Sequence, residues 1–146
     1  MRAAALAALV ALAPAAAGAQ ALHDCSHWAT SAASVAEPWA EASRRFANGD
    51  IRLILLDTAE PACCSWFVLV QVPDPGTGYW GCAVLAATAE GLGFRGIDLQ
   101  AARGAYDPRT GLDIAIPVTL HVTDLVTRPA TATIRINRAT GEVSAR

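Results

Sequence analysis

The chain has 146 residues, with 11 basic side chains, 13 acidic side chains and a formal net charge of −2. This balance gives no basic surface for nucleic acid or anionic lipid, so we expect neither as a partner. All 11 basic residues are arginines, which is typical of a GC-rich bacterial genome. The lack of lysine excludes Schiff-base chemistry and lysine general bases.

Residues 1–21 are predicted to be a cleavable export signal. Arg2 supplies a positive start, and Ala3 to Ala13 is an apolar run of the length found in signal peptides. Small residues precede two possible cleavage positions, one after Ala19 and one after Ala21, and the sequence fits both equally well. The run is well short of the roughly 20 residues that span a bilayer. We therefore expect a bacterial protein exported to the periplasm or the extracellular space, with no membrane span.

Residues 22–146 are predicted to form a single disulfide-stabilised domain. Roughly 125 residues is the size of one ordinary domain. Removal of the signal takes away one arginine and no acid, so the mature chain is one charge more negative. The residues before Cys25 are Leu22, His23 and Asp24, which are too large for a lipidation site. No cofactor is expected.

Four cysteines in an exported chain predict two structural disulfides among Cys25, Cys63, Cys64 and Cys82. A hairpin of Ser65–Val72 with Tyr79–Thr88 would place Cys82 roughly opposite Leu69. Cys64 would then lie about 17 Å further along its strand, whereas a disulfide needs Cα atoms within about 7 Å. This register leaves a vicinal Cys63–Cys64 bridge with Cys25–Cys82, unless the sheet has a different order. The pairing stays open.

The segment from Cys25 to Asn48 has the pattern of a helix. Its apolar residues recur at steps of three and four, on one stripe: Trp28, Ala32, Val35, Trp39, Ala42 and Phe46. Pro38 interrupts the pattern, because its ring clashes with the preceding turn. We expect a helix kinked at Pro38 or two successive helices.

From Asp50 onward the apolar period changes to two, which predicts strands. The predicted strands are Ile51–Leu56, Trp66–Val72, Tyr79–Thr88, Phe94–Ala102 and Leu112–Val122. Leu112–Val122 alternates cleanly, and Pro117 within it predicts an edge strand or a bulge. Asp107–Gly111 and Asn137–Gly141 match tight hairpin turns with glycine in the left-handed position.

These elements predict an α+β fold in which the N-terminal helical segment packs on an antiparallel meander of about six or seven strands. The arrangement resembles, in architecture alone, the cystatin-type helix across a curved sheet. The last hairpin, Ile134–Val143, resembles the closing hairpin of PepSY-type exported domains over ten residues, and no function is taken from this resemblance.

The candidate reactive groups favour no chemistry. His23 and His27 are four residues apart, a spacing that suits a metal on a helix face, but they lie at the domain boundary beside Cys25. His121 has Asp124 nearby and no nucleophile motif around it, which is typical of a surface histidine. We predict no catalytic residue and no metal ligand.

Tyr79 and Trp80 are the candidate partner-binding residues, because they follow a loop rich in glycine and proline at Pro73–Gly78. The predicted function is that of a non-enzymatic binding or envelope-associated domain, with another protein as the expected kind of partner. The alternatives are an inhibitor of an exogenous hydrolase, for which a protruding rigid loop at Pro73–Trp80 is required, and an enzyme whose site is built from scattered residues.

Overall fold

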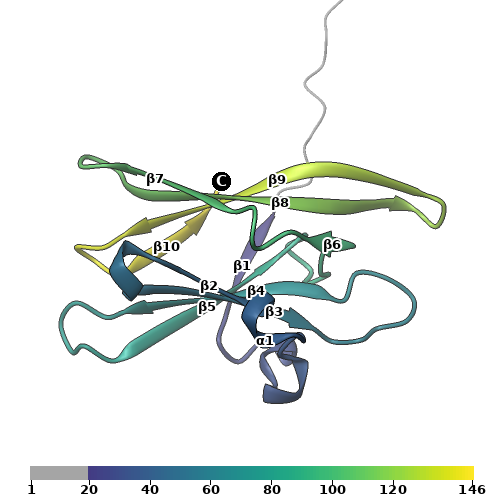
Figure 1. Cartoon of the computed structure of the whole chain (residues 1–146), viewed down its shortest axis with the longest axis horizontal. Helices are drawn as coiled ribbons and strands as arrows, with labels where there is room; N and C mark the ends of the chain where they lie inside the picture. Colours follow the sequence, from purple (N-terminus) through teal and green to yellow (C-terminus); the bar gives the residue numbers. More distant parts are fainter. Residues whose placement is uncertain (1–19) are drawn as a thin grey trace, which may run out of the picture.

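The structure, a computed structural model, describes residues 20–146. Most of the predicted export signal therefore lies outside the described residues. Strands dominate the chain and form two antiparallel sheets stacked as two layers (Figure 1). The first five strands make one sheet, called the N-terminal sheet, and the last five make the other, called the C-terminal sheet.

The N-terminal sheet is a four-strand meander with the first strand added at its far edge. Its spatial order is β1 (Ala21–Asp24), β5 (Trp80–Ala86), β4 (Trp66–Pro73), β3 (Ile51–Asp57) and β2 (Ser43–Phe46). Because β1 lies on one edge and β2 on the other, the chain between them must cross the outer face of this sheet.

The C-terminal sheet is built around a long hairpin. Its order is β10 (Glu142–Ala145), β9 (Val126–Asn137), β8 (Gly111–Thr123) and then β6 (Gly96–Ile97), with β7 (Arg103–Asp107) pairing beside β6 on the same side of β8. The turns at Asp107–Gly111 and Asn137–Gly141 are confirmed, and Gly111 and Gly141 both have positive φ.

The main core lies between the two sheets. Alternate residues of each strand point inward, and they include Leu53 and Val70 from the N-terminal sheet and Ile114, Ile116 and Ile134 from the C-terminal sheet. Each sheet thus supplies the apolar cover that the other needs, in the manner of a β-sandwich. The alternation predicted for β8 is confirmed from Leu112 to Val118.

The long helix predicted over Cys25 to Asn48 is wrong. The segment contains only short turns and β2: the 3-10 helices η1 (Trp28–Thr30), η2 (Ala32–Ser34) and η3 (Ala47–Gly49), and the single turn α1 (Trp39–Ala42). Pro38 directly precedes α1 and kinks nothing. Trp28 and Trp39, two members of the expected buried stripe, are 62% and 57% exposed.

Local hydrogen bonds explain why the helix does not form. Ser31 Oγ accepts the Ala33 N–H, and His27 Nδ1 accepts the Ala29 N–H. Such side-chain bonds compete with the helical ladder. The segment is also held near its middle, where the Ala36 N–H donates to the carbonyl of Leu55. None of the helices among the described residues has the length and apolarity to span a membrane.

The expected α+β arrangement is accordingly wrong, and so is the likeness to a cystatin-type helix on a meander. A second sheet, not a helix, covers the apolar inner face. The crossing segment instead covers part of the outer face of the N-terminal sheet. There Ala29 packs on Leu56, Phe67, Val84 and Ala86 in a second, smaller core.

The cysteines form two disulfides, Cys25–Cys82 and Cys63–Cys64. The predicted hairpin register is shifted by two residues, because Cys82 lies opposite Gln71 and not opposite Leu69. Pairing of β1 with β5 brings Asp24 opposite Ala83, which sets the adjacent Cys25 beside Cys82. That pairing, which joins strands far apart in sequence, could not be read from the hairpin alone.

The position of Pro117 differs from the sequence prediction. β8 is a central strand, with β9 on one side and β7 and β6 on the other. β7 pairs with β8 up to Ala115, and β6 pairs with it from Val118. The missing N–H of Pro117 therefore falls in the gap between these two short strands, where no ladder bond is lost.

The core between the sheets makes a stability prediction. Ile114→Ala removes a fully buried side chain at the centre of the sandwich, so the free energy of unfolding should fall by about 2–5 kcal/mol. Leu125→Ala, at a position that is 96% exposed, should change it by less than about 0.5 kcal/mol. Urea titration followed by circular dichroism measures both, and equal losses would contradict the packing described.

Candidate functional site

The loop between β4 and β5 is tied together by one carboxylate. Asp74 Oδ1 accepts the N–H groups of Gly76 and Thr77 at 3.0 and 2.7 Å and the Thr77 hydroxyl at 2.9 Å. The Asp74 N–H donates to the Tyr79 carbonyl at 2.8 Å. The hydroxyl of Thr77, followed by its N–H, holds the pKa of Asp74 below its ordinary value. The loop is thus ordered by its own hydrogen bonds.

Tyr79 and Trp80, the predicted partner-binding residues, lie where this loop enters β5. Tyr79 is 79% exposed and Trp80 is 42% exposed. The guanidinium carbon of Arg52 lies 3.6 Å from the centroid of the Trp80 ring. This stack encloses Arg52 Nε, which has no hydrogen-bond partner among the described residues. A stacked guanidinium keeps its remaining donors in plane for an incoming carboxylate.

A second arginine lies directly beside Arg52. Arg45 of β2 is its cross-strand partner, and like charges in this position repel. Within residues 20–146, neither of them forms an ion pair with an acidic side chain. The structure therefore gathers positive charge on one face of a protein whose net charge is negative.

Next to the two arginines is a shallow hollow of about 290 Å³. Its lining includes Trp39, Arg45, Arg52 and Gln71, and Gln71 is the partner of Arg52 on β4. We name the surface made by Trp39, Arg45, Arg52, Gln71 and Trp80 the Arg–Trp face. Exposed tryptophan and arginine side chains are the types that contribute most to protein interfaces.

The N-terminal histidines do not share a helix face. His23 is in β1 and His27 follows it, and their ring centroids are 4.8 Å apart. The His27 ring packs against Phe67, and its Nδ1 accepts the Ala29 N–H. Burial lowers the pKa of His27 below its ordinary value, and the neighbouring His23 adds to this effect. These rings therefore take part in packing.

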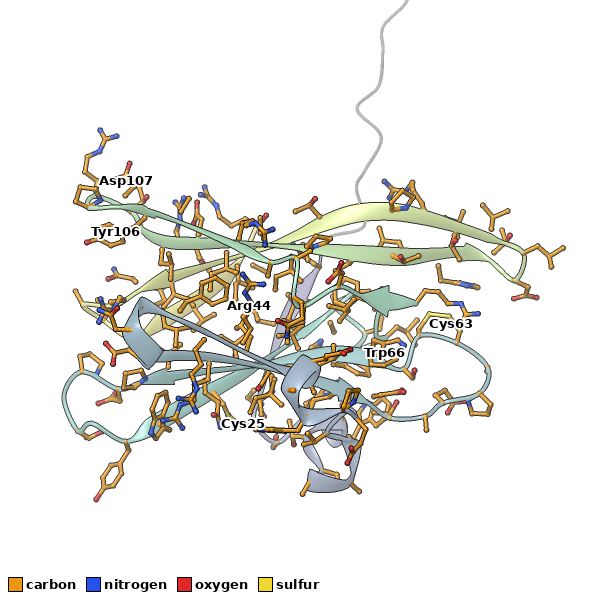
Figure 2. All side chains as sticks on the ribbon, in the orientation of Figure 1. Cys25, Arg44, Cys63, Trp66, Tyr106 and Asp107 are labelled. Carbon is orange, nitrogen blue, oxygen red and sulfur yellow. A yellow bond between two sulfur atoms is a disulfide. The ribbon has the colours of Figure 1, made fainter. Side chains whose placement is uncertain are left out.

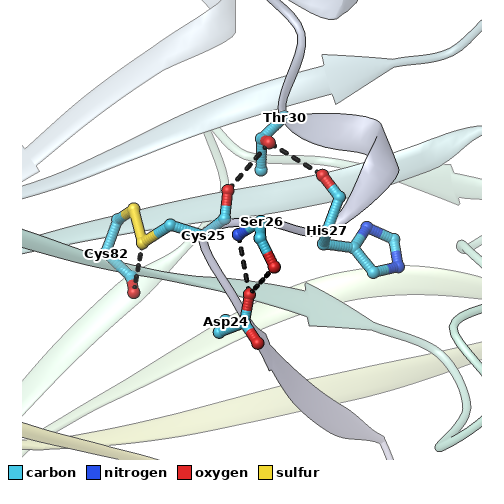
Figure 3. Close-up of a disulfide and its surroundings, with 6 residues drawn as sticks. All are labelled: Asp24, Cys25, Ser26, His27, Thr30 and Cys82. Atoms are coloured by element: carbon cyan, nitrogen blue, oxygen red, sulfur yellow. Dashed lines mark hydrogen bonds between the residues drawn. A yellow bond between two sulfur atoms is a disulfide. The ribbon is translucent and has the colours of Figure 1, made fainter.

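Cys25 precedes His27 by two residues, and its disulfide with Cys82 lies at a turn held by several hydrogen bonds (Figure 3). The Thr30 hydroxyl is placed to donate to the carbonyls of Cys25 and His27, at 3.0 and 2.7 Å. Ser26 donates its N–H and its hydroxyl to the Asp24 carboxylate, and these bonds lower the pKa of Asp24. The arrangement anchors the crossing segment to β5.

A second group of side chains gathers at the other end of β4. The Sγ atoms of Cys63 and Cys64 and a ring nitrogen of His121 all lie within 4.8 Å of one another. Figure 2 shows Cys63 with its disulfide on the loop that leads into β4. A hollow of about 230 Å³ adjoins it, lined by Cys64, Gly93, His121 and Arg128 among others.

Comparisons of this chain with protein-family models, with curated proteins and with solved structures give no significant match.

Sequence reasoning selected Tyr79 and Trp80 and missed their arginine neighbours. Arg52 is the one charged residue in the apolar run Ile51–Leu56, and this was an available signal that its face of the strand is open. His121 was interpreted as an isolated surface histidine. It is exposed, but it lies against the paired cysteines, which are distant in sequence and carry no local signal of this contact.

Gly93 is predicted to be essential for the approach of the cysteine loop. A Cβ at this position would lie 2.2 Å from the Cys64 carbonyl oxygen and 2.7 Å from that of Trp66. Gly93→Ala should therefore lower the free energy of unfolding by about 3 kcal/mol, because backbone has to shift. Gly96→Ala, which meets only contacts of 3.7 Å, is the matched control and should cost less than about 1 kcal/mol. Thermal or urea unfolding distinguishes them, and similar losses would refute this account.

His27 is predicted to make stability fall in mild acid. Its folded-state pKa lies below the ordinary value of 6.5, so the unfolded chain binds the proton more readily. Stability should therefore decline as the pH falls below 6.5, until the pH passes the folded-state pKa. His27→Gln should reduce the difference in unfolding free energy between pH 7 and pH 5, measured by urea titration. An unchanged difference would show that another group is responsible.

Proposed function

We propose that this chain is an exported, non-enzymatic binding domain of the bacterial envelope that holds an acidic protein partner through the Arg–Trp face. The observation that carries the proposal is the stack of Arg52 on Trp80, with Arg45 directly opposite Arg52. Two arginines on neighbouring strands, neither with an acidic partner in the described chain, favour a ligand that brings carboxylates of its own.

The aromatic side chains support a protein partner. Trp39 and Trp80 are exposed beside the arginines, and Tyr79 is exposed next to Trp80 in the chain. Large rigid rings contribute binding area at low cost in conformational entropy. Free arginine donors in the plane of the stack suit the side chains of aspartate and glutamate, which accept two parallel hydrogen bonds. Tryptophan, tyrosine and arginine are the residue types most enriched at the strongest positions in protein interfaces.

Export to the periplasm or the extracellular space is part of the proposal. The Cys25–Cys82 disulfide supports it, because such bridges persist in oxidising compartments. We infer cleavage after Ala19, because the Gln20 side chain donates to the carbonyls of Thr133 and Arg146. Cleavage after Ala21 would remove these bonds and one pair of the β1–β5 ladder.

An inhibitor of an exogenous hydrolase is the second candidate. It is favoured by the hydrogen bonds that Asp74 makes across its loop, since a preorganised loop loses little entropy on entering a cleft. The turn around Gly141 packs against Pro75 and so supports this loop. In this case the bound partner is a hydrolase whose activity falls, and Tyr79→Ala relieves the inhibition.

The binding proposal predicts which substitutions release the partner. The mature protein is immobilised and exposed to proteins of the compartment to which it is exported. Trp80→Ala and Arg52→Ala should each reduce recovery of the partner at least about tenfold, as expected for central interface residues. Arg109→Ala is the matched control, because its side chain is 86% exposed on a distant turn. Its recovery should equal that of the wild type.

Salt provides the second measurement. Binding to Arg45 and Arg52 should weaken as the salt concentration rises from about 0.05 to 0.5 M, because screening reduces charge attraction. Circular dichroism establishes that each variant is folded. If folded Trp80→Ala and Arg52→Ala recover the same proteins in the same amounts as the wild type, the Arg–Trp face is not the binding surface.

A further inference from the structure

The group formed by Cys63, Cys64 and His121 is separate from the Arg–Trp face. The cysteines lie on the loop between β3 and β4, and His121 is near the end of β8 in the other sheet. Three atoms that coordinate metals, two sulfurs and one ring nitrogen, lie within 4.8 Å of one another. In this structure the two sulfurs are bonded to each other, so they can bind an ion only after the disulfide is reduced.

The loop backbone is held independently of the disulfide. The Thr58 N–H donates to the carbonyl of Ser65 at 3.0 Å and closes the base of the loop. Trp66 and Phe94 exchange backbone hydrogen bonds of 3.2 and 2.7 Å. Gly93 lets the Cys64 carbonyl approach to a distance that no side chain would permit. Opening of the disulfide therefore leaves the two sulfurs beside His121.

The sulfurs are within reach of a reductant and of an ion. Cys63 and Cys64 are only half-buried, and His121 is exposed. No hydrogen bond to the His121 ring is present within residues 20–146, so the lone pair of its unprotonated nitrogen is available there. The adjoining hollow of about 230 Å³ gives an entry path to Cys64.

Charge at the site favours two thiolates. Arg128 of β9 lines the same hollow as Cys64 and His121. A monovalent ion bound by two thiolates and a neutral imidazole has a net charge of −1, and the guanidinium offsets that charge. A nearby arginine also favours the thiolate over the thiol.

The donor set selects the ion. Thiolate sulfur is a soft ligand that suits Cu(I) and zinc. Structural zinc sites almost always have four protein ligands, whereas this group supplies three from the described residues. Three ligands with two sulfurs complete the coordination of Cu(I) and leave zinc with an open position.

We propose that Cys63, Cys64 and His121 form a Cu(I) site that exists only after a dithiol has reduced the vicinal disulfide. In the reduction, the Sγ–Sγ bond breaks, both sulfurs gain a hydrogen, and the donor dithiol becomes a disulfide. When Cu(I) binds, the two thiols release two protons to solvent and two Cu–S bonds form. The lone pair of one His121 ring nitrogen forms the third bond.

The test is a competition for Cu(I) without oxygen. The mature protein is reduced with a dithiol, freed of the reductant, and titrated against a coloured Cu(I) chelator. The reduced protein should retain one Cu(I) that the oxidised protein does not. Cys63→Ser with Cys64→Ser should lose that equivalent, although the thiols of Cys25 and Cys82 remain. His121→Gln should weaken binding at least about tenfold, since it removes a direct ligand, and His23→Ala should match the wild type.

X-ray absorption at the copper edge provides a readout that does not depend on affinity. The wild-type shell should contain two sulfurs and one nitrogen, and that of His121→Gln should lose the nitrogen. Because His121→Gln leaves both disulfides intact, its fold can be checked in the oxidised state by circular dichroism. Equal retention of Cu(I) by oxidised and reduced protein, or an unchanged shell and affinity in His121→Gln, would overturn the proposal.

Discussion

The burial of two sheets against each other is the constraint on which the rest of the structure depends. Leu53 and Val70 of the N-terminal sheet and Ile114 and Ile134 of the C-terminal sheet are fully buried between the layers. Since each sheet covers the other, the crossing segment between β1 and β2 contributes only the small side chains of Ala36 and Ala42 to this core. It covers the outer face of the N-terminal sheet around Phe67 and leaves the end of that sheet near Trp80 open.

The two candidate sites follow from this division of the outer surface. They lie at opposite ends of β4, whose eight residues span about 26 Å at roughly 3.3 Å per residue. At the Pro73 end, open sheet surface carries the stacked Arg52 and Trp80. At the Trp66 end, the layers meet through β8 and the cysteine loop, which brings His121 to the sulfurs. The Arg–Trp face is built on the N-terminal sheet, whereas the group of Cys63, Cys64 and His121 requires both sheets.

The main error in the sequence prediction has an identifiable cause. Cys25 to Asn48 has helical spacing of its apolar residues, but Ser31 and His27 bond to nearby backbone, and β1 is drawn into a ladder with β5. The spacing of apolar residues shows which side chains could share one face of a helix. It does not show which element covers the sheet. Leu112–Val122 was predicted well, because its alternation reflects a buried and an open face directly. The strand predicted over Phe94–Ala102 is wrong, since only Gly96–Ile97 of this range forms a strand.

By itself, the sequence determined the strands near Ile51–Leu56, Trp66–Val72, Tyr79–Thr88 and Leu112–Val122, the glycine turns, the expectation of two disulfides and the selection of Tyr79 and Trp80. Each of these features follows from a local pattern or a residue count. The signals are side-chain alternation, glycine in the left-handed position of a turn, an even number of cysteines and aromatic residues after a loop. Only the tertiary structure decided that two sheets stack, that Cys25 pairs with Cys82, and that Arg52 and His121 have the neighbours described. These features join strands far apart in sequence, and their register is set by packing over the whole domain.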